Sequence, residues 1–177
     1  MRNHYVLIIA IIILFSCKKQ TDTVNTAQLD EYMPLTVGKY IHYRLDSMRF
    51  IDFGQRDTII SYEAKDIIDG ETTDGEGKLT YRVNRFLRDI NSLDENDYRQ
   101  TLTYYVTPST KGVDVIENNL RYQKLKLPVT ETFNWHGNTY LPDGPFYATY
   151  EFSNDIDIHE WDYTYQDVNS SVQIGDS

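Results

Sequence analysis

The side chains best suited to acid–base or metal chemistry are a few scattered histidines and a run of acids near the end of the chain. His42, His136 and His159 lie far apart, and none belongs to an HExxH motif or another paired-histidine spacing. Asp155, Asp157 and His159 alternate with apolar residues, so a strand would aim them from one face, as a site for a hard metal ion requires. Strands commonly alternate in this way to display a solvated face, so we expect no metal ion and no other cofactor.

A second group of acids also has a plain structural interpretation. Asp69, Glu71, Asp74 and Glu76 crowd a glycine-containing segment that could bind calcium, but the glycine is out of place for an EF-hand loop. We favour a solvated hairpin tip. There is no G-x-S-x-G motif, and the acids are too numerous and scattered to single out a glycosidase pair. We therefore expect a protein that is not an enzyme, with a hydrolase that uses an unrecognised acidic site as the least favoured alternative.

Cys17 is the one cysteine of the chain, and it closes an apolar segment. Arg2 precedes an unbroken apolar run over residues 5–15, and the chain turns polar after Ser16 and Cys17. The run is about half the ~20 residues that a membrane-spanning helix needs, so residues 1–16 are predicted to be a secretory signal peptide. The alternative, a buried structural thiol, is disfavoured because free cysteines lie in cores and not at polar boundaries.

The end of this run resembles the lipobox of bacterial lipoproteins. Leu14 is an aliphatic residue three places before Cys17, and Ser16 is a small residue just before it. The resemblance implies cleavage between Ser16 and Cys17 and attachment of acyl chains to Cys17, which would hold the protein on a membrane. Several chains make such attachment stable, because one acyl chain binds only marginally, at ~10⁴ M⁻¹. Residues 17–31 lack apolar periodicity until Leu29 and are expected to form a flexible, lipidated tether.

We expect a single β-rich domain over residues 32–177. Its opening segment, Tyr32–Tyr40, combines a proline–leucine turn, a Val–Gly pair and an aromatic strand, and it resembles the start of uncharacterised lipoprotein domains of the Bacteroidota. That resemblance transfers no activity. Together with the lipobox it implies a location in the cell envelope, anchored by lipid to the outer membrane and facing the periplasm. Similar sequences continue with a further strand pair, so we expect the domain to be incomplete at its end.

Charge and hydrophobic periodicity limit the class of protein. The 177 residues carry a net charge of −10, which excludes nucleic acid as a favoured partner because the phosphate backbone would be repelled. From Tyr40 onward, apolar residues recur at every second position, as in strands with one buried face. The alternating rows are Ile41–Leu45, Ile60–Ala64, Leu79–Val83 and Tyr98–Val106, with Gln100 as an exception in the last row; residues 113–116, 120–127, 146–152 and 161–168 are further predicted strands, and residues 90–97 are predicted to hold one helical turn.

Short turns separate these strands. Asp69–Gly70, together with Asp74 to Gly77, predicts one hairpin loop, residues 108–112 predict a tighter one, and Asn118–Asn119 can supply the left-handed positions of a third. Strands separated so closely pair with their sequence neighbours. The expected fold is therefore mainly β, an antiparallel meander that forms a curved sheet, a sandwich or an open barrel.

Tyrosine is unusually abundant, with 15 tyrosines against 7 phenylalanines. These rings either line a binding surface or pack in half-buried strands, and we favour the second interpretation because most follow the strand alternation. The exception is a loop-like aromatic segment, in which the candidate ligand-binding residues are Trp135, His136, Tyr140, Phe146 and Tyr147. We expect a lipid-anchored envelope protein with a binding or structural role toward an envelope protein or a small ligand. The alternative is a carrier that holds a sugar or lipid on an aromatic-lined concave sheet.

Overall fold

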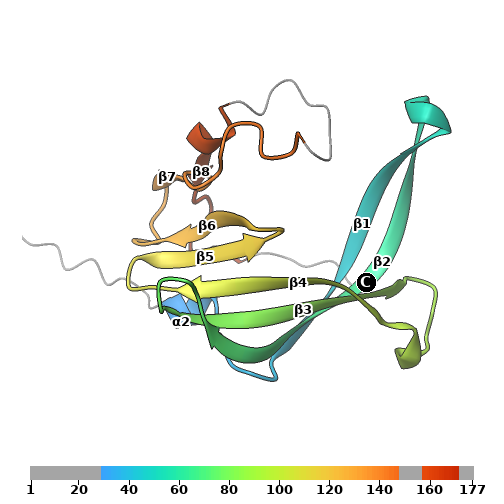
Figure 1. Cartoon of the computed structure of the whole chain (residues 1–177), viewed down its shortest axis with the longest axis horizontal. Helices are drawn as coiled ribbons and strands as arrows, with labels where there is room; N and C mark the ends of the chain where they lie inside the picture. The colour runs from blue at the N-terminus through green and yellow to red at the C-terminus, as the bar shows by residue number, and fades with distance from the viewer. Residues whose placement is uncertain (1–28, 148–156, 172–177) are drawn as a thin grey trace, which may run out of the picture.

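The computed structural model describes residues 29–147 and 157–171 (Figure 1). Six strands form one antiparallel sheet in sequence order, which confirms the predicted meander. They are β1 (Tyr40–Ile51), β2 (Arg56–Thr73), β3 (Leu79–Asp89), β4 (Arg99–Pro108), β5 (Gly112–Glu117) and β6 (Leu120–Lys126). A smaller sheet pairs β7 (Asn134–His136) with β8 (Asp162–Thr164). The helical elements are α2 (Leu29–Tyr32), η1 (Asp52–Gly54), η2 (Glu95–Asp97) and η3 (Ile158–Glu160).

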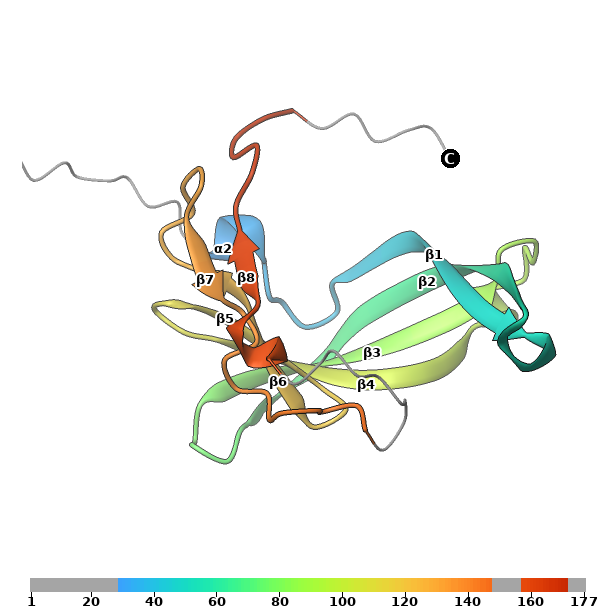
Figure 2. The ribbon, with the colours of Figure 1, turned by 90° about the horizontal axis from the view of Figure 1, so that it is seen from above.

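The large sheet curls into a half-barrel (Figure 2). Of the predicted curved sheet, sandwich and open barrel, this form corresponds to a strongly curved, open sheet and not to a sandwich. The long hairpin of β1 and β2 stands at a steep angle to β3 and β4 (Figure 1). No helix within residues 29–147 and 157–171 has the length and apolar character needed to cross a bilayer.

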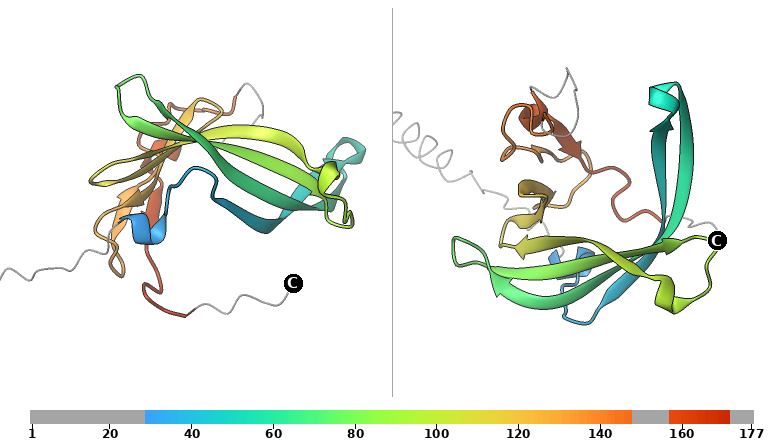
Figure 3. Two further views of the ribbon diagram at one scale, coloured as in Figure 1. Left: turned by 90° about the horizontal axis from the view of Figure 1, so that it is seen from below. Right: turned by 45° about the vertical axis from the view of Figure 1, so that its right-hand side comes forward.

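A segment that we call the strap, residues 29–39, crosses the hollow face of the sheet (Figure 3). Its end is fixed to β2, because Gly38 N–H donates to the Ile68 carbonyl at 2.8 Å and Ile68 N–H donates to the Lys39 carbonyl at 2.9 Å. Leu29, Met33 and Leu35 of the strap pack against the buried core, which is formed by Val83, Val106 and Val113. Complete burial of a side chain of this size contributes about 1.5–3 kcal/mol, and these three are partly buried, so the strap contributes to the stability of the folded domain.

Two of the predicted turns are confirmed. β4 ends at Pro108 and β5 begins at Gly112, where Ser109 N–H donates to the Gly112 carbonyl. Between β5 and β6, Asn118 and Asn119 both adopt left-handed backbone angles, with φ of 52° and 63°. Asparagine tolerates this region better than most residues, which explains its place in so short a hairpin.

The predicted loop at Asp69–Gly70 is wrong, because both residues lie inside β2. The register shifts between Ile68 and Gly70, so the glycine marks a bulge and not a turn. The actual turn follows Thr73: the Asp74 carboxylate accepts hydrogen bonds from two backbone N–H groups, each at 2.9 Å. Of the predicted loop, Asp74 to Gly77 therefore form the turn, whereas Asp69–Gly70 mark an irregularity within the long strand.

The row of alternating residues through β4 is interrupted by a second irregularity. The register shifts opposite Arg85 and Phe86, which leaves Thr101 without a directly paired residue. Gln100 therefore lies on the opposite face from Leu102, and its side chain bonds to Asn84 and Thr103 of that face. The register shift explains why Gln100 is polar in the row predicted over Tyr98–Val106. The shift also places Tyr98 on the outer face of the sheet, whereas the sequence predicted it on the same face as Leu102.

Toward the end of the chain, two predicted strands need correction, as does the strand considered for the metal site over residues 155–159. Ile158–Glu160 form the 3-10 helix η3, not a strand, and Asp155 lies outside the described residues. Phe146 and Tyr147 lie in a turn, and the rest of that predicted strand also lies outside the described residues. The strand predicted over residues 161–168 is only the three-residue β8. The helical turn predicted within residues 90–97 is confirmed as η2.

Candidate functional site

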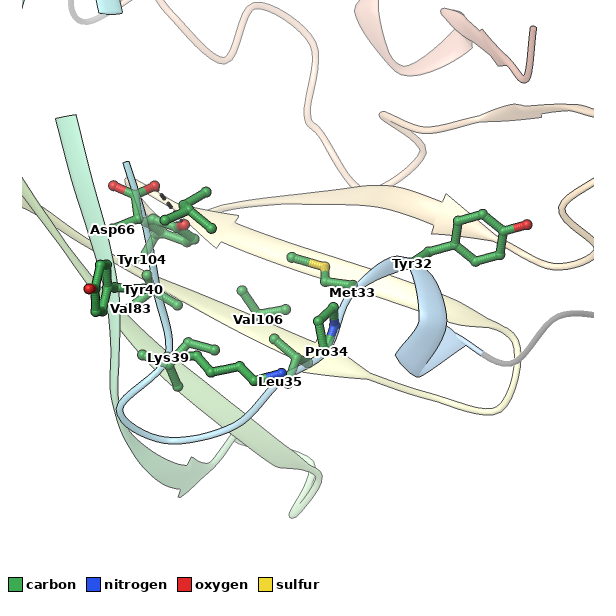
Figure 4. Close-up of a pocket in the computed structure, with 12 residues that line it drawn as sticks. Tyr32, Met33, Pro34, Leu35, Lys39, Tyr40, Asp66, Val83, Tyr104 and Val106 are labelled. Carbon is green, nitrogen blue, oxygen red and sulfur yellow. Dashed lines mark hydrogen bonds between the residues drawn. The ribbon is translucent and has the colours of Figure 1, made fainter. Parts of the chain in front are cut away.

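A cavity of about 350 Å³ lies between the strap and the hollow face of the sheet (Figure 4). A volume of this size is within the range of small-molecule sites. The strap contributes one wall, and β1 to β4 contribute the other. Most of the lining residues are apolar. The lining residues are Tyr32, Met33, Pro34, Leu35, Lys39, Tyr40, Ile41, Asp66, Ile68, Val83, Tyr104 and Val106.

Asp66 forms a polar group at one side of this cavity. It is 5% exposed, and its carboxylate accepts two hydrogen bonds from Arg85, from Nε and Nη2, each at 2.9 Å. The hydroxyls of Tyr43 and Tyr104 donate to the same carboxylate at 3.1 and 2.9 Å. Four donors from three other strands thus converge on one acid, and its charge is balanced by the guanidinium of Arg85.

The electrostatics of this network hold its protons in place. Burial, followed by the charge of Asp66, raises the pKa of Tyr43 from 10.0 to about 12. The same two causes raise the pKa of Tyr104. The hydrogen bonds to Asp66 likewise raise the pKa of Arg85, and its guanidinium lies 5.3 Å from the Tyr104 ring centre. At neutral pH both tyrosines are hydrogen-bond donors to the carboxylate of Asp66, so the geometry suits binding better than proton transfer.

A second cavity of about 510 Å³ lies on the other side of the strap. Met33 and Leu35 line both cavities, so the strap divides one longer hollow into two parts. The remaining walls of the second cavity come from Leu29, Asp30, Tyr81, Val113, Leu127 and the Pro108–Thr110 turn. Together the two cavities give the concave face a mainly apolar lining on both sides of the strap.

The key residues of this site were not singled out from the sequence, although a signal was present. Along β2, Ala64, Asp66 and Ile68 occupy successive inward-facing positions. Arg85 continues the row of Val83 in the same way. A charged residue at an inward position of a half-buried strand requires a partner, and the antiparallel register places these two side by side.

The aromatic segment predicted as a ligand site has a different arrangement. Trp135 is 6% exposed, its indole N–H donates to the Gln123 carbonyl at 2.8 Å, and its ring packs 4.7 Å from that of Tyr165. The contacts of Trp135 join the small sheet to β6. His136 lies at the surface with Nδ1 2.9 Å from the Glu160 carbonyl oxygen.

The other three candidates lie farther along the same segment. Tyr140 and Tyr147 are exposed, and Phe146 is half-buried. None of the five predicted residues lines either of the two cavities described above. Their role in binding stays a prediction, and Ser16 and Cys17 of the lipobox lie outside the described residues.

Two of the acids that suggested a calcium site form ion pairs with arginines. Asp69 pairs with Arg82, and Asp74 pairs with Arg121 at 3.3 Å. Within the described part of the chain, no three histidine, cysteine or acidic side chains are grouped as a metal ion would need. Comparison with family models, curated proteins and solved structures found no match for the chain.

Proposed function

We propose that this protein is a lipid-anchored binding protein of the cell envelope that holds an apolar or amphipathic molecule on the concave face of its sheet. The cavity between strap and sheet is the observation that supports it most strongly. Its lining is apolar apart from Asp66, Lys39 and the tyrosine hydroxyls, and Asp66 is already neutralised by Arg85. A site of this chemistry favours a lipid-like chain over a sugar, because a sugar needs many unsatisfied hydrogen-bonding groups.

Lys39 gives the ligand a preferred polar end. Its side chain is exposed at the edge of the cavity, close to Leu35 (Figure 4). An ammonium group beside an apolar hollow favours a molecule with an acidic head, such as a fatty acid, over a neutral hydrocarbon. The anchor on Cys17 would keep such a binding protein at the membrane, where molecules of this class are found.

The test is a titration of the full chain with a fluorescent fatty acid, using two isoleucines of β1 and β2 as a matched pair. Ile41 lines the cavity, whereas Ile59 lies on the opposite face, and the two are 62% and 65% exposed. We expect Ile41→Asp to weaken binding at least about tenfold, which corresponds to ~1.4 kcal/mol, and Ile59→Asp to leave it unchanged. No saturable binding by the native chain, or equal losses in both variants, would contradict the proposal.

A further inference from the structure

The far end of the β1–β2 hairpin carries large apolar side chains that are exposed to solvent. β3 pairs with β2 only as far as Tyr62, so the remainder of the hairpin is a two-stranded ribbon that projects beyond the sheet (Figure 1). Its exposed apolar side chains are Met48, Phe50, Ile51, Phe53 and Ile59, which we call the tip cluster. Isolated exposed apolar residues are ordinary, but Met48, Phe50 and Ile59 share one face of the ribbon, with Phe53 beyond them in the turn, and a group of this kind indicates a partner.

The turn of this hairpin holds an aromatic ring at its apex under backbone strain. Asp52 and Phe53 have φ of 51° and 55°, and Gly54 has φ of 82°. A left-handed conformation costs a residue such as phenylalanine about 1–2 kcal/mol, and Phe53 gains no burial in return because its side chain is fully exposed. Such strain without compensating contacts is typical of a residue placed to meet a partner.

The charges of the tip differ from those of the whole chain. Arg49, Asp52, Arg56 and Asp57 balance one another, and Arg56 pairs with Asp52. The full chain carries a net charge of −10. An acidic protein is repelled by the anionic surface of a membrane, so the neutral, apolar tip is the part of this hairpin that can approach a bilayer at low electrostatic cost.

We propose that the tip cluster inserts into a lipid bilayer. The tip cluster consists of five residues, whereas a stable protein interface takes ~20–30 residues from each partner, and a fluid bilayer accommodates a small convex tip. Aromatic side chains are also enriched at the membrane–water interface. Tip insertion does not depend on ligand binding in the cavity, and it would add a second membrane contact to the acyl anchor proposed on Cys17.

The test reports the depth of the tip itself. In the full chain with Cys17→Ser, a polarity-sensitive fluorophore is attached to Phe53→Cys or, as a control, to Leu93→Cys, which is another exposed apolar residue in the loop after β3. Vesicles of phosphatidylcholine, with and without brominated acyl chains, are then added. We expect a blue shift at position 53 and its quenching by the bromines, with neither effect at position 93.

Two companion variants separate insertion from other causes. Ile59→Asp, within the tip cluster, should abolish the blue shift, and Ile41→Asp, outside it, should leave the shift intact. No response at position 53, or equal quenching at both labelled positions, would overturn the proposal. A blue shift that grows with protein concentration in the absence of vesicles would also overturn it, because the occupant would then be a second copy of the chain.

Discussion

Arg85 and Asp66 face each other on neighbouring strands, and the guanidinium donates two hydrogen bonds of 2.9 Å to the carboxylate. Asp66 is 5% exposed, so the pair lies in a region of low dielectric. The hydroxyls of Tyr43 and Tyr104 both donate to Oδ2 of the same carboxylate. The polar side of the cavity is therefore preorganised and neutral before any ligand enters.

The first prediction concerns the dependence of this pair on both members. Arg85→Leu leaves a buried carboxylate without its counter-charge, and we expect it to lower the free energy of unfolding by about 3 kcal/mol. The double variant Asp66→Leu/Arg85→Leu should lose less than the single variant, because the half-buried hydroxyls of Tyr43 and Tyr104 that lose their acceptor cost less than a buried charge without its counter-charge. Urea unfolding of the three chains measures both differences. A double variant less stable than Arg85→Leu would contradict the assignment.

The second prediction concerns alkaline pH. The pKa of Tyr43 is raised from 10.0 to about 12, so the folded chain retains a proton that the unfolded chain loses in this range. The contribution of Tyr43 to stability is thus complete below pH 10 and is lost as the pH rises through about 12. In a titration of phenolate absorbance, Tyr43→Phe should remove a tyrosine that ionises near pH 12. Removal of one that ionises near pH 10 would show that burial and the charge of Asp66 do not raise the pKa of Tyr43.

Sequence periodicity predicted most of the sheet, because each strand has one buried face and short turns fix which strands pair. The site was missed for a related reason. Asp66 and Arg85 lie two positions beyond the predicted rows Ile60–Ala64 and Leu79–Val83, and the periodicity of apolar residues does not mark charged positions. The bulge at Thr101 could not be predicted, because it depends on pairing with β3. The cavity was also beyond the sequence, since the strap forms it through contacts of Met33 and Leu35.

The third prediction tests the hairpin turn that the sequence did predict. Asn119 has φ of 63°, a conformation that β-branched residues strongly disfavour. We expect Asn119→Thr to lower the free energy of unfolding by about 1–2 kcal/mol, measured by urea unfolding. Asn119→Gly is the control, because glycine adopts this conformation without strain, and its stability should stay within about 0.5 kcal/mol of the native chain.

The fourth prediction separates the two tryptophans. Trp135 is buried and bonds to the Gln123 carbonyl, whereas Trp161 is 54% exposed. Trp135→Ala should cost about 3 kcal/mol and loosen β7 and β8 from β6. Gln123 N–H donates to the Gly137 carbonyl across this junction, so its hydrogen exchange should accelerate in Trp135→Ala and not in Trp161→Ala. Equal exchange in the two variants would show that Trp135 does not hold the small sheet.

The last prediction is that one substitution at the hairpin apex raises the stability of the fold and weakens membrane binding. Phe53 is fully exposed at φ of 55°, so Phe53→Asn removes no buried surface and places a residue that tolerates this conformation. We expect a gain of about 0.5–1 kcal/mol in urea unfolding. Phe50→Asn, at an extended position of β1, should instead lose stability because asparagine is a poor strand former.

Both variants should reduce insertion of the tip into phosphatidylcholine vesicles, measured by a fluorophore on Ile51→Cys in the Cys17→Ser chain. Their effects on the free energy of unfolding should have opposite signs, which distinguishes relief of backbone strain from loss of membrane contact. A Phe53→Asn chain that is less stable than the native one would show that the ring is held by contacts within the protein.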